Sequence, residues 1–211
     1  MATSSRALLV LGLLASMGWL GVTWAQREGS AVPALALYAV AAGLVILLRA
    51  RRQLGPLLRL SLRGSVLGLG VGAAMTAATY LGYPMVAALE PAVAAEVRGL
   101  YQQLELGDPA TALPLVCIVV AGEELVWRGA LLEGLAPGRR WSSRELGKVA
   151  LASAAYAVAQ AGFGSALLVA VALPCGAVWA ALRLHTRELG APLLSHLVWS
   201  SFVLWLVPLQ P

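Results

Sequence analysis

Residues 109–132 read PATALPLVCIVVAGEELVWRGALL. The run is long enough to cross a bilayer, because a spanning helix needs about 20 apolar residues. It nevertheless contains two adjacent glutamates, Glu123 and Glu124, followed by Arg128. Each ionisable group in the middle of a span costs roughly 2.5–3.5 kcal/mol on insertion scales. Two adjacent carboxylates at this depth therefore indicate a function rather than packing alone.

The composition of the whole chain favours a membrane protein. Of its 211 residues, 60% are hydrophobic and 12% are charged, and the mean hydropathy is +0.81. A soluble domain has roughly 25% charged residues, which cover its water-facing surface. So few charges predict that lipid covers most of this chain. We expect an all-α polytopic membrane protein that forms a single transmembrane domain over 1–211.

The apolar runs indicate about seven transmembrane helices. They cover about 7–25, 31–48, 64–89, 109–132, 149–161, 165–182 and 191–207. The third run is rich in small residues, which let helices approach closely in lipid. The first run could be a cleaved signal peptide, because Thr23-Trp24-Ala25 resembles a small-x-small cleavage site. Its length and the spans that follow it favour a helix that is retained.

The positive charges predict the orientation in the membrane. The net charge of +5 could indicate nucleic acid, but the basic residues lie in short loops between the apolar runs. With the N-terminus in the cytoplasm, nearly all of these loops face inside, as the positive-inside rule requires. Only Arg27 and Arg98 would face outside, together with the acid-rich segment 90–108. The basic residues on the inside would be Arg6, Arg49, Arg51, Arg52, Arg59, Arg63, Arg139, Arg140, Arg144, Lys148, Arg183 and Arg187. We expect no nucleic-acid partner.

The two glutamates are expected to differ in role. Arg128 lies four residues after Glu124, so the two side chains share a helix face and can pair. Glu123 is turned from Glu124 by about 100° and is not neutralised in this way. A free carboxylate there suits a general base that activates water. An ion-paired packing cluster and the proton relay of a transporter are the alternatives.

A few other polar residues within apolar runs are candidates for the same site. His196 lies near the start of the last run, with Ser200 four residues later on the same face. Gln160 lies late in the fifth run, with Tyr156 one turn earlier. A lone histidine in a span often belongs to the core, and a glutamine can simply join helices by hydrogen bonds. His185 is expected in a solvated loop. Cys117 and Cys175 are expected to be packing residues.

Three short motifs resemble those of the CPBP family, the CAAX-protease and bacteriocin-processing intramembrane endopeptidases. Residues 123–128, EELVWR, resemble the family's EExxxR motif. Residues 156–160, YAVAQ, stand in the place of FxxxH, and residues 196–200, HLVWS, in the place of HxxxN or HxxxD. The segment 184–194, LHTRELGAPLL, resembles the family's loop before its last motif. The resemblance covers about 112–205, which would be the catalytic core.

The resemblance implies a fold and a set of roles. Family members are helical membrane proteins whose motifs converge on a cavity open to the cytoplasmic side. Glu123 would be the base that activates water, and Gln160 would hold the place of the family's histidine. His196 with Ser200 would form the oxyanion site, and Glu124 with Arg128 would organise the first motif.

Two departures from the family pattern bear on the chemistry. Gln160 can orient water but cannot take up a proton at neutral pH. The hydroxyl of Ser200 can still donate to an oxyanion. Metal binding is often part of the family's description, but a Glu/Glu/His set is not supported by the spacing here. A glutamate-activated water without a metal or other cofactor is therefore favoured.

The expected function is that of an intramembrane endopeptidase acting on a membrane-anchored protein. The preferred role is trimming C-terminal anchors during surface-protein sorting, as myxosortase-like relatives do, in a bacterial inner membrane. The alanine-, leucine- and arginine-rich composition points to a bacterium. A catalytically weak homologue that acts as a membrane binding or immunity protein is the alternative. A small transporter is disfavoured because no inverted repeat is visible.

Overall fold

The computed structural model describes residues 4–104, 109–136, 138 and 141–209, and within these ranges the chain contains helices and no strand. Glu105, Asp108, Arg139 and Arg140 of the predicted acidic and basic segments lie outside the described residues. The helices are α1 (Ser5–Ala25), α2 (Val32–Leu54), η1 (Gly55–Leu57), α3 (Leu62–Leu89), α4 (Ala92–Leu104), α5 (Pro109–Glu123), η2 (Glu124–Leu131), α6 (Leu132–Gly134), α7 (Ser143–Gln160), η3 (Ala161–Phe163), α8 (Ala166–Thr186), α9 (Gly190–Ser201) and η4 (Phe202–Leu206).

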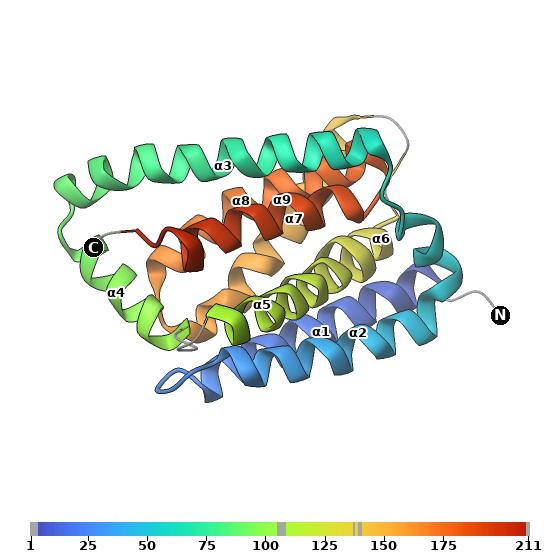
Figure 1. Ribbon diagram of the computed structural model, residues 1–211. Helices are drawn as coiled ribbons and strands as arrows, with labels where there is room; N and C mark the ends of the chain where they lie inside the picture. Colours follow the sequence, from blue (N-terminus) through green and yellow to red (C-terminus); the bar gives the residue numbers. More distant parts are fainter. Residues whose placement is uncertain (1–3, 105–108, 137, 139–140, 210–211) are drawn as a thin grey trace.

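The long helices lie side by side, so their connections gather at two ends of the bundle (Figure 1). We call one the arginine end; it comprises residues 49–63, 141–148 and 183–189. There the Leu189 N–H donates to the Leu57 carbonyl. We call the other the α4 end; it comprises 26–31, α4, 161–165 and 207–209. There the Ala31 N–H donates to the Gln103 carbonyl, and the Gln103 amide donates to the Phe163 carbonyl.

The chain is a multi-pass membrane protein. Within the described residues, five helices are long and apolar enough to span a membrane: 5–25, 32–57, 62–89, 110–134 and 166–186. The other two predicted runs form α7 and the shorter apolar stretch Gly190–Leu206. A further helix, α4, forms in the segment 90–108, for which no helix was predicted. The four acidic residues of this segment made it resemble a polar connection, and only Val97 of the helix is buried.

The first helix packs into the bundle. Trp19 is fully buried, and its ring lies edge-on against Trp127, with centroids 5.1 Å apart. The Thr23 hydroxyl on the same helix reaches the Ala159 carbonyl of α7. These contacts tie α1 to η2 and α7, the two elements on which the glutamate pair and Gln160 lie.

Glycines on one face of α3 bring it against α9. The buried residues of α3 are Gly64, Gly68, Gly72 and Thr76, which recur every four residues. A Cβ at Gly68 would collide with the Ala191 backbone, whereas one at Gly70 would meet nothing within 4 Å. The close approach confirms the expectation from the small residues of this run. It also fixes the position of α9, which includes His196 and Ser200.

Candidate active site

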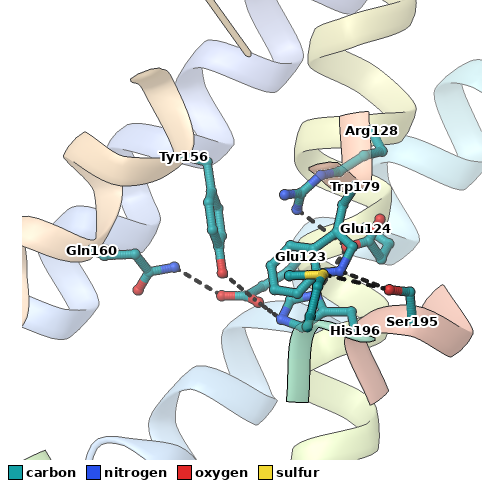
Figure 2. Close-up of polar contacts among 9 residues, drawn as sticks. Glu123, Glu124, Arg128, Tyr156, Gln160, Trp179, Ser195 and His196 are labelled. Atoms are coloured by element: carbon teal, nitrogen blue, oxygen red, sulfur yellow. Dashed lines mark hydrogen bonds and ion pairs between the residues drawn. The ribbon is translucent and has the colours of Figure 1, made fainter. Parts of the chain in front are cut away.

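The glutamate pair lies where α5 changes into a wider, π-helical turn (Figure 2). Glu123 is the last residue of α5, and Glu124 begins η2. At the end of η2 the Leu132 N–H reaches back five residues to the Trp127 carbonyl. Such π-helical turns are rare and frequently mark functional sites. Both side chains are buried: residue exposures are 6% for Glu123 and 2% for Glu124.

Glu124 is held by two partners from different helices. The Arg128 guanidinium donates to its Oε1 at 3.2 Å, as the spacing of four residues predicts. His196 Nδ1 lies 2.9 Å from the same oxygen. Arg128 itself lies over the rings of Tyr156 and Trp179, with centroid distances of 4.6 and 5.1 Å. Glu124 and Arg128 are therefore fixed in the core rather than free to act as acid or base.

Glu123 points toward a second set of side chains. The Gln160 amide donates to Oε1 at 2.9 Å, and the Tyr156 hydroxyl donates to Oε2 at 3.3 Å (Figure 2). His196 Nε2 lies 3.3 Å from the same Oε2. Its hydrogen-bonding partners are an amide, a phenol and a histidine, and no arginine or lysine among the described residues contacts it directly. Glu123 therefore differs from Glu124, which pairs directly with the permanent cation Arg128.

His196 bridges the two carboxylates. Its ring stacks on Trp179 with centroids 3.7 Å apart, and the Trp179 indole donates to Ser195 at 3.2 Å. Only the doubly protonated imidazolium can donate from both ring nitrogens. The stack fixes the plane of the ring and thereby both contacts.

A cavity of about 120 Å³ lies beside Glu123. Its polar lining comes from Glu123, Tyr156, Gln160, His196 and Ser200. Ser200 is buried one turn after His196 and faces this same space. The structure thus brings together all six residues singled out from the sequence, five as a bonded cluster and Ser200 as part of the cavity wall.

One family model matches the chain. Residues 106–202 match the model described as type II CAAX prenyl endopeptidase Rce1-like. The resemblance to the CPBP family is confirmed. The matched CPBP segment contains the glutamate pair, Gln160, His196 and Ser200, and it supports a CAAX-type intramembrane protease. No curated protein and no solved structure matches the chain.

The CPBP segment does not fit a metal ion. Within the described residues, no group of three or more histidine, cysteine, aspartate or glutamate side chains is arranged to hold one. The donor geometry explains this. Glu124 Oε1 is shared between Arg128 and His196, and the two His196 nitrogens point to different carboxylates. A guanidinium inside the cluster also opposes a second positive charge there.

Sequence reasoning missed two residues that shape the site. Trp179 positions the His196 ring and lies beside Arg128, and Ser195 holds the Trp179 indole. Tyr156 was noted one turn before Gln160 and as the first residue of the second motif, but without a contact to Glu123, to which it donates. A tryptophan within an apolar run gives no sign of a polar partner. The serine directly before His196 was the one available signal.

Proposed function

We propose that the protein is an intramembrane endopeptidase in which Glu123 activates the attacking water. The observation that supports this most is a buried carboxylate without a bonded arginine or lysine, at the wall of a cavity within the bundle. Gln160 and Tyr156 hold its two oxygens in place. A base positioned next to enclosed space can take a proton from a water molecule there.

The reaction would proceed in two steps. Glu123 accepts a proton from water, and the resulting hydroxide adds to the carbonyl carbon of the peptide bond. The carbonyl oxygen becomes an oxyanion. The C–N bond then breaks, and the leaving amine takes the proton that Glu123 holds. The products are a new carboxyl group and a new amine, so no oxidant or other reactant is needed.

His196 and Ser200 are placed to stabilise the oxyanion. His196 is part of the cavity wall, and its Nε2 has the longer of the two histidine contacts, 3.3 Å to Glu123. A substrate carbonyl entering the cavity can compete for this N–H while the bond from Nδ1 to Glu124 holds the ring. The Ser200 hydroxyl supplies a second donor one turn away. Removing one such donor typically costs about 10²–10³-fold in rate.

The proposed substrate is a membrane-anchored protein. A site enclosed by helices in the bilayer is reached by a peptide segment that is itself held at the membrane. We assign the protein to sorting, where it trims C-terminal anchors of surface proteins in a bacterial inner membrane. The composition and the myxosortase-like resemblance support this assignment.

The test follows processing of anchored proteins in cells. Cells of a strain that lacks the protein are supplied with the wild type, the Glu123→Ala variant or the Glu28→Ala variant. Glu28 lies exposed in the connection 26–31 and is not part of the cluster or of the cavity wall. We expect at least one anchored protein to accumulate uncleaved with Glu123→Ala, and normal maturation with Glu28→Ala. Unchanged termini of every anchored protein would reject the protease function.

A binding or immunity protein is the second candidate, because Gln160 and Ser200 depart from the family pattern. A binder depends on shape and hydrogen bonding rather than on a proton acceptor. It should therefore keep its partner and its cellular effect in the Glu123→Gln variant, whereas a protease should lose its effect.

A further inference from the structure

The residues that line the Glu123 cavity all lie toward one end of the bundle. On α5 they are Glu123 and residues before it, and on α9–η4 they are His196 and residues after it. On α2 they are Val32 and Leu35, at the start of the helix, and on α8 only Leu168, also near the start. Each of these stretches runs toward the α4 end. The cavity therefore extends from Glu123 toward α4 and not toward the arginine end.

The opposite side of the cluster is closed by packed side chains. Trp127 and Leu131 on η2 are fully or almost fully buried, as is Leu54 at the end of α2. The Leu54 and Leu189 side chains both lie next to Gly129, on the arginine-end side of Glu124. Interiors packed in this way leave no room for a peptide. Among the described residues, this side of the cluster is closely packed, whereas the cavity lies on the other side.

A second, larger cavity lies beneath α4. It has a volume of about 270 Å³ and is lined by α3, α4, α8 and the α9–η4 stretch. Leu104, Leu168, Trp199 and Leu204 belong to the walls of both cavities. A single layer of side chains therefore separates the space beneath α4 from the space beside Glu123.

The α4 cavity is apolar but borders unpaired hydrogen-bonding atoms. The Tyr83 hydroxyl in its wall and the Trp205 indole nitrogen in the wall of the Glu123 cavity are buried and have no partner among the described residues. Buried polar atoms are nearly always paired. A peptide with apolar side chains would bury its apolar surface against these walls, and its backbone carbonyl groups would accept hydrogen bonds from the two unpaired donors.

Two expectations from the sequence, the orientation of the chain and the side on which the cavity opens, conflict in this structure. The positive-inside rule places the arginine end in the cytoplasm, while the family resemblance implies a cavity open to the cytoplasm. The cavity extends to the other end. The α4 end has only a mixture of charges, from Arg27, Arg98, Glu90 and Glu96, whereas the arginine end is strongly basic. We therefore follow the positive-inside rule and place the arginine end in the cytoplasm.

We propose that the substrate reaches Glu123 from the α4 end, on the non-cytoplasmic face of the membrane. This inference rests on the proposed function for the reaction itself. The substrate class is then an extended, apolar peptide at the external end of a membrane anchor, and its apolar side chains occupy the cavity beneath α4. Two hydrogen bonds hold α4 over this cavity: Ser165 donates to Glu96 at 2.6 Å, and Tyr101 donates to the Val203 carbonyl at 2.7 Å.

Cysteine labelling tests the route without requiring catalysis. In a background in which Cys117 and Cys175 are alanine, single cysteines are introduced at Leu168, in the shared wall, at Gly29, in the exposed connection at the α4 end, and at Ser143, exposed at the arginine end. A small charged methanethiosulfonate that does not cross membranes is added to right-side-out and to inverted vesicles. We expect Leu168→Cys and Gly29→Cys to react in right-side-out vesicles, and Ser143→Cys only in inverted ones.

Any other pattern overturns the inference. Reaction of Leu168→Cys from the same side as Ser143→Cys, or from neither side, would place the entry elsewhere. Reaction of Gly29→Cys only in inverted vesicles would reverse the orientation. Processing in cells that depends on Glu123 tests the protease function separately, so a wrong entry route can be distinguished from a wrong function.

A blocking variant gives a second readout. Leu168→Trp fills the layer between the two cavities, and we expect it to slow substrate processing by about tenfold or more, because small misplacements of a substrate are costly. Leu151→Trp is the matched control, since Leu151 is exposed on the outside of α7. Equal processing rates for the two variants would contradict an entry at this layer.

Discussion

Glu123 and Glu124 are adjacent in the chain but have different surroundings. Glu124 contacts a guanidinium and a histidine, whereas Glu123 contacts an amide, a phenol and the same histidine. The difference arises because neighbouring residues on a helix point in different directions. One glutamate is therefore part of the ion-paired core, and the other faces the cavity.

Arg128→Met should destabilise the fold because it leaves Glu124 buried without its cation. Removing one partner of a buried ion pair typically lowers the free energy of unfolding by about 3–5 kcal/mol, whereas replacing both partners by apolar residues is often close to neutral. The double variant Glu124→Leu/Arg128→Met should therefore regain most of the lost stability. Unfolding in detergent measures both variants. Equal destabilisation of the single and the double variant would contradict the pairing as described.

The helices place these side chains through close backbone contacts. The α9 helix, which includes His196, is positioned by the glycine face of α3 and lies next to α5 and α8. A bulky residue on this face would push α9 away from the glutamates. The site therefore depends on glycines that never contact it.

Gly68→Leu and Gly70→Leu form a matched pair on this helix. At position 68 the new side chain collides with the Ala191 backbone, and at position 70 it points into open space. We expect Gly68→Leu to lower the unfolding temperature and abolish processing, and Gly70→Leu to resemble the wild type. Thermal unfolding and the processing assay measure the two effects. A Gly68→Leu variant with wild-type behaviour would reject the α3–α9 packing.

The attachment of α4 to the bundle should weaken in acid. The Ser165 hydroxyl and then the Leu167 N–H donate to Glu96, and these bonds lower the pKa of its carboxyl. A lowered pKa in the folded state stabilises the docked helix above the ordinary glutamate pKa of about 4.3, and this contribution is lost as the pH falls through the lower, folded-state pKa. A reporter dye on α4, followed from pH 7 to pH 3, should show release in acid for the wild type. In Glu96→Gln this acid-dependent step should be absent; an unchanged step would mean that another group controls it.

The sequence predicted the parts of the site that spacing determines. The Glu124–Arg128 pair follows from four residues on one helix face, and the end of α7 at Gln160 agrees with the apolar run 149–161. The sequence did not reveal α4, because its apolar face, formed by Val93, Val97, Leu100 and Leu104, belongs to a short helix within an acidic segment rather than to a long apolar run. It also missed the Trp179–His196 stack, because contacts between α8 and α9 depend on packing that no local pattern encodes.

The whole bundle is asymmetric between its two ends. Arginines and a packed core occupy one end, and cavities beneath an amphipathic helix occupy the other. The basic residues of the arginine end are the basis for the orientation that we propose. The close packing on that side and the cavities on the other are the basis for the proposed side of entry. The two together direct the proposed protease toward segments that lie outside the cytoplasm.

Chelators should leave the activity unchanged. Arg128 and His196 share Oε1 of Glu124, and Gln160, Tyr156 and His196 hold the oxygens of Glu123, so the described residues offer no preformed set of ligands for a metal. Purified protein incubated with a strong chelator and then freed of it should process substrate at the original rate. Complete loss of activity that returns with an added divalent metal would show that the resting cluster rearranges around an ion.

The most direct test compares purified wild type with Glu123→Gln, both reconstituted in liposomes with the precursor that accumulates in Glu123→Ala cells. The amide preserves the size of the side chain and its contact with the cavity but cannot accept the proton from water. Loss of a general base typically costs about 10²–10⁴-fold. The account predicts cleavage by the wild type and a rate at least about 100-fold lower for Glu123→Gln. Equal rates for the two proteins would contradict the central role of Glu123.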